Sequence, residues 1–101
     1  PEAIRAHLKA FSYPAHALRD PNHVLVAMSR ATVTPEAAVF SRGGTLAYHG
    51  RIDDRYVHIG LERPAPTVHD LADALTATLA GAPVREATAP AVGCYIADFV
   101  P

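Results

Sequence analysis

The sequence predicts a single α/β domain, and three observations support this. Half of the 101 residues are hydrophobic and 19% are charged, the composition of a globular chain with one core. Leu71, Leu75 and Leu79 recur every four residues, the spacing of an apolar helix face. Gly43 and Gly44 separate two short apolar runs, as in a tight β-hairpin. One helix layered on a hairpin is an α/β or α+β architecture.

The chain begins with a predicted helix over residues 1–11. Ile4, Leu8 and Phe11 recur at i, i+4 and i+7 and form one apolar face. The Ser-Tyr-Pro sequence that follows ends the helix, because the residue before a proline is pushed toward extended conformations. We expect a short extended strand from Ala15 to Leu18.

A second, shorter helix is predicted after residue 20. Asp20 is a favourable N-cap and Pro21 a favourable first helical residue. Val24, Leu25 and Met28 would form its buried stripe.

The hairpin is predicted over residues 36–50, and a long loop follows it. A short apolar run from Ala38 to Phe40 forms the first strand. Leu46 and Tyr48 alternate with smaller or polar neighbours on the returning strand. Residues 51–66 are polar and contain prolines, which predicts a connection that is long for a compact domain.

The clearest helix is predicted to start at Thr67 and to end before Gly81. Thr67 would be the N-cap, with Asp70 three residues later in a capping-box arrangement. Gly81 suits the position just beyond the helix C-terminus. The predicted order is thus helix, short strand, helix, hairpin and helix, followed by a tail from Ala82 with one small apolar patch.

Charge and motif content exclude several classes of function. The chain has nine Lys and Arg residues and ten Asp and Glu residues, so it has no excess of basic residues with which to bind nucleic acid. No apolar run approaches the roughly 18 residues of a membrane span. The chain contains no GxSxG, P-loop or HExxH motif and implies no cofactor. The one cysteine, Cys94, excludes a CxxC pair within this chain and does not fix the compartment.

The stretch VTPEAAVFSRGGTLAYHGRIDDRY, with YPAHALRDPNHVLVAMS before it, resembles the C-terminal half of a thioredoxin-like redoxin. This group includes alkyl-hydroperoxide-reductase-type and thiol-disulfide-isomerase-like domains. In that fold a Thr-Pro dipeptide with a cis-proline opens a core strand beside the active-site cysteine, and Thr34-Pro35 matches it. GRIDDRY and the AVGC tail are similar to one bacterial branch, for which cytoplasm and periplasm are both open. The resemblance covers residues 1–96 and leaves 97–101 as a tail.

The resemblance implies an incomplete thioredoxin-like fold, which lacks the N-terminal βαβ unit with the catalytic cysteine. This chain would supply the substrate groove of Val33, Thr34 and Pro35, and Cys94 as a possible resolving thiol. Its partners would be the missing N-terminal half, or a second copy through the strand edge that this half leaves exposed, and a protein thiol or disulfide. The alternative is a catalytically inactive binding or dimerisation module, and a weaker third option is a metal carrier through Cys94 and a histidine.

Cys94 itself has two interpretations. It is a thiol that pairs with a cysteine outside this chain, or a soft metal ligand. Alternatively it is a small buried hydrophobe among Val92, Tyr95 and Ile96, since free cysteines are often buried. Gly93 beside it would permit a close backbone approach.

Charged residues and histidines crowd the segment after the hairpin: His49, Arg51, Asp53, Asp54, Arg55 and His58. One interpretation is a metal site formed by the histidines and carboxylates. However, the His-x3-Asp and Asp-x3-His spacings would put these ligands on one face only in a helix, and Gly50 at a strand end argues against a helix here. Asp53 and Asp54 are adjacent and point apart, so they would make a poor acid/base pair. We therefore predict a solvated loop in which Arg51 and Arg55 pair with the two aspartates, each pair contributing about 0–1 kcal/mol. An anion or a partner bound by either arginine is the less favoured option.

Overall fold

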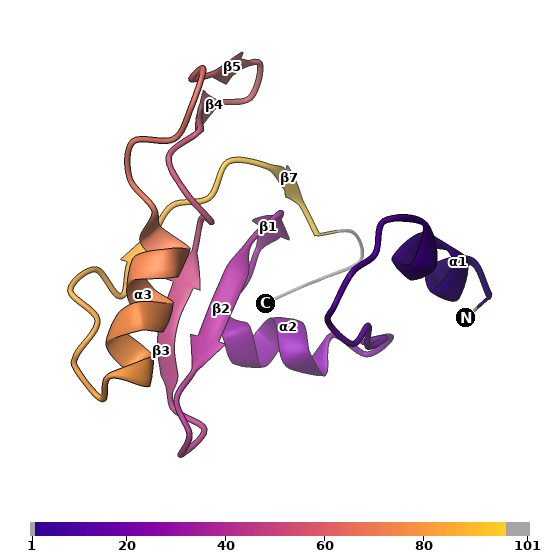
Figure 1. Ribbon diagram of the computed structural model, residues 1–101, viewed down its shortest axis with the longest axis horizontal. Coiled ribbons are helices and arrows are strands. Elements are labelled where there is room, and N and C mark those ends of the chain that lie inside the picture. Colours follow the sequence, from indigo (N-terminus) through magenta and orange to yellow (C-terminus); the bar gives the residue numbers. More distant parts are fainter. Residues whose placement is uncertain (1, 97–101) are drawn as a thin grey trace.

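The computed structural model describes residues 2–96, and it is a mixture of helices and small sheets (Figure 1). The elements in chain order are α1 (Glu2–Ala10), α2 (Val24–Ser29), β1 (Val33–Thr34), β2 (Ala37–Phe40), β3 (Leu46–Gly50), β4 (Tyr56–His58), β5 (Leu61–Glu62), α3 (Asp70–Leu79), β6 (Thr88–Ala89) and β7 (Cys94–Tyr95). The α/β class predicted from the sequence is confirmed at this level. Within the described residues no helix is both long and apolar enough to cross a bilayer.

The predicted hairpin forms the centre of the main sheet. β2 and β3 pair antiparallel, with Ala38 opposite His49 and Val39 opposite Tyr48. Gly44 lies in the turn with a φ of 85°, a conformation that glycine adopts without steric cost. β6 adds to the far side of β3 in parallel, which gives the strand order β2-β3-β6. β2 is therefore an edge strand of this sheet among residues 2–96.

The core lies between this sheet and α3. Val39, Tyr48 and Ala74 form the buried cluster, and the ring of Tyr48 is completely inaccessible to solvent. The predicted leucine stripe holds for Leu71, which packs against this cluster, but is wrong for Leu75 and Leu79, which are 43% and 87% exposed. The helix instead turns the small side chain of Ala74 toward the bulky Tyr48, where a leucine would need more room.

The start of α3 also differs from the prediction. The helix begins at Asp70 rather than just after Thr67, so the predicted capping box is wrong. The amides of Thr67 and Val68 donate instead to the carboxylate of Asp54, at 2.6 and 2.8 Å. Asp54, distant in the sequence, thus satisfies the Thr67 amide that the Asp70 side chain was expected to satisfy in the capping box. Gly81 follows the helix with a φ of 72°, as predicted.

The N-terminal helices form where predicted, but their apolar faces lie at the surface. In α1, Ile4 is 38% exposed and no residue of the helix is buried, and Phe11 just beyond its end is 66% exposed. In α2, Val24 and Met28 are more than half exposed. The predicted burial of the α2 stripe is wrong within residues 2–96, because no described element covers these side chains. The apolar face predicted for α1 is likewise at the surface. Figure 1 shows α1 standing apart from the sheet.

Two further segments differ from expectation or refine it. The predicted strand from Ala15 to Leu18 is not formed, since no described segment pairs with it. Asp20 does cap the start of α2, accepting hydrogen bonds from the amides of Val24 and Val26 at 2.9 and 3.0 Å, although His23 occupies the N-cap position itself.

The predicted long loop contains a second hairpin. β4 and β5 pair antiparallel, with Tyr56 opposite Glu62, and Gly60 in the turn has a φ of 88°. This arm projects from the body of the molecule (Figure 1), and Ile59 near its tip is 70% exposed. The interpretation of residues 51–66 as an unstructured connection is therefore wrong.

The molecule has more surface than its mass predicts. Its accessible surface is 7854 Å², whereas a folded monomer of 10.7 kDa should expose about 5500 Å². Its radius of gyration is 14.7 Å, against about 13 Å for a compact domain of this length. The excess agrees with the exposed apolar faces of α1 and α2.

Candidate functional site

The three predicted groove residues lie where the chain enters the main sheet. Val33 and Thr34 form β1, and Pro35 connects β1 to β2. The Thr34–Pro35 peptide bond is cis, as the resemblance implied.

Cys94 lies directly beside these residues. β7 pairs antiparallel with β1, which places Cys94 opposite Thr34 and Tyr95 opposite Val33. The amide of Ile96 donates to the carbonyl of Thr32 at 3.0 Å and extends the pairing. The cysteine is exposed, so its interpretation as a buried hydrophobe is wrong. A two-residue strand at the surface has too few neighbours to cover it.

Gly93 makes this pairing possible, as the sequence suggested. A Cβ atom on Gly93 would lie 1.9 Å from the carbonyl oxygen of Thr34, far inside van der Waals contact. The two backbones therefore approach so closely that only glycine fits at this position.

The charged segment after β3 is organised differently from the prediction. Arg51 pairs through Nε with Asp70 at 2.6 Å, and Arg55 pairs through Nε with Glu62 at 3.2 Å. The predicted pairing of these arginines with Asp53 and Asp54 is therefore wrong. The β4–β5 register brings Glu62 close to Arg55, and the start of α3 brings Asp70 to Arg51. Neither approach is visible in the local sequence.

The two aspartates have different roles. Asp53 is half-buried and accepts a hydrogen bond from the amide of Arg55 at 2.9 Å. Asp54 is buried, and its carboxylate accepts hydrogen bonds from the hydroxyl and amide of Thr67 and from the amide of Val68. Arg63 lies 3.6 Å away as an ion-pair partner. The Thr67 hydroxyl, followed by these other donors, holds the pKa of Asp54 well below its usual range.

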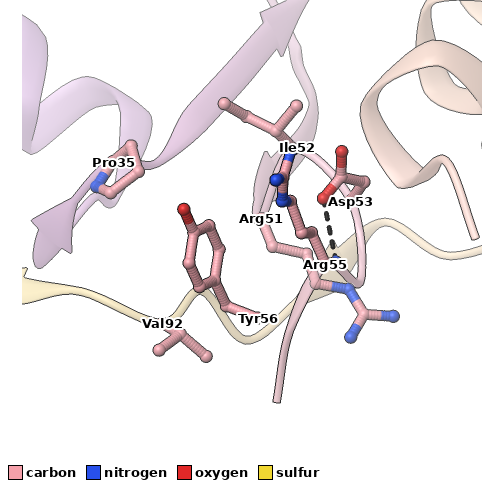
Figure 2. Close-up of a pocket in the computed structure, with 7 residues that line it drawn as sticks. All are labelled: Pro35, Arg51, Ile52, Asp53, Arg55, Tyr56 and Val92. Atoms are coloured by element: carbon pink, nitrogen blue, oxygen red, sulfur yellow. Dashed lines mark hydrogen bonds between the residues drawn. The ribbon is translucent and has the colours of Figure 1, made fainter. Parts of the chain in front are cut away.

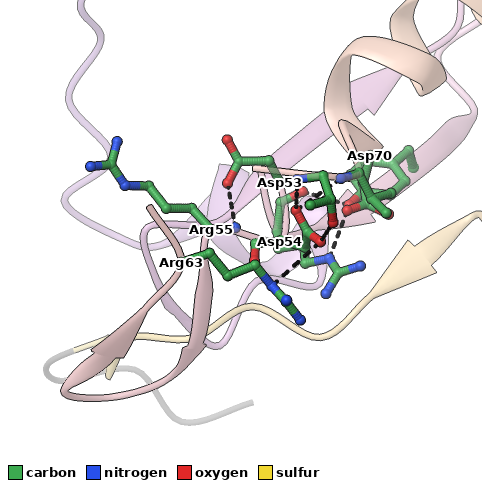
Figure 3. A network of polar contacts seen from close by, with 9 residues as sticks. Asp53, Asp54, Arg55, Arg63 and Asp70 are labelled. Atoms are coloured by element: carbon green, nitrogen blue, oxygen red, sulfur yellow. Dashed lines mark hydrogen bonds and ion pairs between the residues drawn. The ribbon is translucent and has the colours of Figure 1, made fainter. Parts of the chain in front are cut away.

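A part-buried polar network fixes the position of Arg51, and Figure 3 shows Asp54, Arg63 and Asp70 among the residues around it. Its Nε donates to Asp70, whose side chain is only 6% exposed. Its carbonyl oxygen accepts a hydrogen bond from the hydroxyl of the buried Tyr48 at 2.6 Å. Burial, and then the charge of Asp70, raise the pKa of Tyr48 to about 12. The hydrogen bond to Asp70 raises the pKa of the Arg51 guanidinium. Sequence analysis missed Tyr48 and Asp70 as parts of this site.

The histidines do not complete a metal site. His49 is part of β3, while His58 is part of the projecting β4 strand and contacts the carbonyl of Ile59 through Nδ1 at 2.9 Å. Among residues 2–96, no group of three or more His, Cys, Asp or Glu side chains is arranged to hold a metal ion.

A pocket of about 210 Å³ lies next to the groove (Figure 2). Its walls combine apolar and charged side chains from β1–β2, the segment after β3, and the tail: Pro35, Arg51, Ile52, Asp53, Arg55, Tyr56 and Val92. The pocket shares Pro35 with the groove, and Val92 is two residues from Cys94. One region of the molecule thus contains the proline, an accessible thiol and a fixed arginine.

Comparison with known proteins relates the fold to solved structures without assigning a function. No protein-family model matches the chain, and no curated protein matches it. A hypothetical protein from Sinorhizobium meliloti superposes with a TM-score of 0.74 and 28% identity, over 99% of this chain and 53% of that one. An uncharacterized conserved protein from Geobacillus kaustophilus gives a TM-score of 0.71 and 28% identity, over 100% and 51%. The chain spans about half the length of both.

Proposed function

We propose that this chain is the C-terminal portion of a thioredoxin-like thiol-disulfide or peroxide oxidoreductase. Val33, Thr34 and Pro35 form part of its substrate groove, and Cys94 is its second thiol. The nucleophilic cysteine belongs to a segment outside these 101 residues. The observation that carries the proposal is the pairing of Cys94 with Thr34, which brings an exposed thiol to the groove from the far end of the sequence.

The excess surface supports a missing covering segment. The open edge of β2 and the exposed faces of α1 and α2 are where the N-terminal βαβ unit of the resemblance would pack. The solved structures that superpose on the whole of this chain are about twice as long, so each has a further segment of similar size. Covering these faces would remove apolar surface from water, which stabilises a fold by about 25 cal/mol per Å².

In disulfide exchange, the nucleophilic thiolate attacks one sulfur of the substrate disulfide and releases the other as a thiolate. Cys94, as its thiolate, then attacks the enzyme sulfur of the mixed disulfide. This forms an enzyme disulfide and releases the second substrate thiolate. With a hydroperoxide, the nucleophile is oxidised to a sulfenic acid and the peroxide is reduced to an alcohol or water. Cys94 then condenses with the sulfenic acid, releasing water.

A second candidate is a catalytically inactive binding or dimerisation module, and the open edge of β2 favours it. β2 pairs with β3 on one side alone in the described part of the chain, and Phe40 at its end is 39% exposed. An unpaired strand edge accepts a further strand through main-chain hydrogen bonds. In this alternative a second copy of the chain supplies that strand, and Cys94 has no redox partner.

The test is the intact mass of the natural polypeptide, with and without thiol alkylation under non-reducing conditions. We expect a mass well above the 10.7 kDa of this chain and a Cys94 that is alkylated only after reduction. The Cys94→Ser variant should lose turnover, and after oxidation its other cysteine should stay as a sulfenic acid or a mixed disulfide and form no internal disulfide. A mass equal to that of these residues, with Cys94 free after peroxide treatment, would overturn the oxidoreductase proposal and favour the binding module.

A further inference from the structure

We propose that the pocket between Pro35 and Arg51 binds the carboxylate of a small organic acid, with Arg51 as the principal donor. The inference deepens the proposed function and rests on it in one respect. If Cys94 is a redox thiol, the acids in question are small carboxylate-bearing thiols and disulfides. The carboxylate site itself is argued from the pocket alone.

Arg51 is fixed at both ends. In its side chain, Nε donates a hydrogen bond to the buried Asp70. In its backbone, the carbonyl oxygen accepts a hydrogen bond from the Tyr48 hydroxyl, and the amide donates one to the carbonyl of Ala89 at 3.0 Å. The guanidinium has five N–H donors, and the bond to Asp70 is made through Nε, so the Nη groups can donate to a ligand. A planar fork held in this way matches a carboxylate with little loss of side-chain entropy on binding.

The other charged side chains of the pocket are less suited than Arg51 to donate hydrogen bonds to a carboxylate. Asp53 accepts a hydrogen bond from the amide of Arg55, and the guanidinium of Arg55 forms an ion pair with Glu62 on the projecting arm. Figure 2 shows the Arg55 guanidinium directed away from Pro35. Because Asp70 balances the charge of Arg51 and Asp53 is a further anion, recognition depends on directed hydrogen bonds more than on net attraction. Binding should therefore weaken little with added salt.

The remaining walls suit the carbon chain of an acid. Pro35, Ile52 and Val92 are apolar, and Tyr56 presents a ring with a polar end. The volume of about 210 Å³ is below the range of about 300–1,000 Å³ that is typical of sites for drug-sized ligands. The pocket therefore fits a short acid rather than a large cofactor.

The site adjoins the thiol through both of the strands that meet there. Pro35 follows Thr34, which pairs with Cys94, and Val92 precedes Cys94 on the same segment. A ligand seated in the pocket therefore lies against the backbone that leads to the thiol. An acid with a sulfur at the other end of its chain would be held by its carboxylate close to the groove.

The first test is an amide ¹H–¹⁵N NMR titration of the full natural polypeptide with 3-(methylthio)propionate, which has no reactive thiol. We expect saturable shifts at Arg51, Tyr56 and Val92. The methyl ester should bind about tenfold more weakly, because it loses the hydrogen bonds of a charged group. Arg51→Lys should weaken acid binding by a similar factor. Arg42→Lys, in the β2–β3 turn, is the matched control and should change nothing.

Two outcomes would overturn the pocket assignment. One is equal binding of the acid and its ester, and the other is acid binding that Arg51→Lys leaves unchanged. If Arg51→Lys does not fold, Val92→Phe tests the same idea, because it fills the pocket and keeps the arginine. Loss of acid binding in Val92→Phe would support the assignment, and unchanged binding would overturn it.

The second test addresses the substrate class. In the proposed function the nucleophilic cysteine attacks a disulfide, forms a mixed disulfide with one half and releases the other half as a thiolate, and Cys94 then resolves the mixed disulfide. We expect mixed-disulfide formation with 3,3′-dithiodipropionate to exceed that with 2-hydroxyethyl disulfide several-fold, and Arg51→Lys should abolish the difference. Equal rates would overturn the substrate class. If Cys94 forms no disulfide with the nucleophilic cysteine during the reaction, that would count against the proposed function, while the titration would still decide the carboxylate site.

Discussion

Gly93→Ala is expected to separate β7 from β1 and so to remove Cys94 from the groove. The added Cβ atom would lie 1.9 Å from the Thr34 carbonyl oxygen, where ordinary contact begins at 3.4 Å. The two backbones would have to move apart by roughly 1.5 Å to relieve this overlap. In the neighbouring hydrogen bond, the amide nitrogen of Ile96 lies 3.0 Å from the carbonyl oxygen of Thr32. Hydrogen bonds between backbone amides and carbonyls extend only to about 3.2 Å. The pairing is therefore lost rather than stretched.

Amide hydrogen exchange measures this effect directly. In Gly93→Ala the Ile96 amide should exchange at the rate of an unprotected amide, while the amides of β2 and β3 keep their protection because the core is elsewhere. Gly43→Ala is the control, since a Cβ there meets no atom within 4 Å. Retained protection at Ile96 in Gly93→Ala would refute the close-approach argument, and so would an equal loss in Gly43→Ala.

Three further predictions concern the polar network. Tyr48→Phe should lower the free energy of unfolding in urea by about 1 kcal/mol, because it removes the bond to the Arg51 carbonyl; an unchanged midpoint would contradict this. Asp70→Asn should cost about 2 kcal/mol by breaking a partly buried ion pair, and a smaller loss than Tyr48→Phe would argue against that pair. The pKa of Asp54 is lowered on folding, so its stabilisation is present above the unfolded value of about 3.8 and is lost as the pH falls toward the folded value. Wild type should lose stability more steeply than Asp54→Asn between pH 5 and pH 2, and parallel curves would count against this assignment.

The features that the sequence predicted correctly are those with local signals. The Gly43-Gly44 turn and the short apolar runs on either side of it predict the hairpin from β2 to β3. Gly60 carried a similar signal for the β4–β5 hairpin, with short apolar stretches on either side, and it was overlooked because residues 51–66 are rich in charge.

The features that were wrong or missed depend on contacts between distant segments. The spacing of Leu71, Leu75 and Leu79 indicated the helix, but Leu75 and Leu79 lie at the surface and the helix buries Ala74 in the cluster with Tyr48. The pairing of Cys94 with Thr34 and the ion pair of Arg51 with Asp70 join segments far apart in the chain. No periodicity or spacing in the sequence indicates either contact, so neither partner could be predicted from the sequence.

The main sheet has two edges of different character, and this limits how the molecule assembles. On one side β6 is only two residues long and is followed by Pro90, which has no N–H to donate. On the other side β2 is a longer edge strand with no neighbour in the described part of the chain. A further strand can therefore pair with this sheet only at the β2 edge. Any association through this sheet should stop once that position is filled, so the stoichiometry is one to one and a growing fibre is disfavoured.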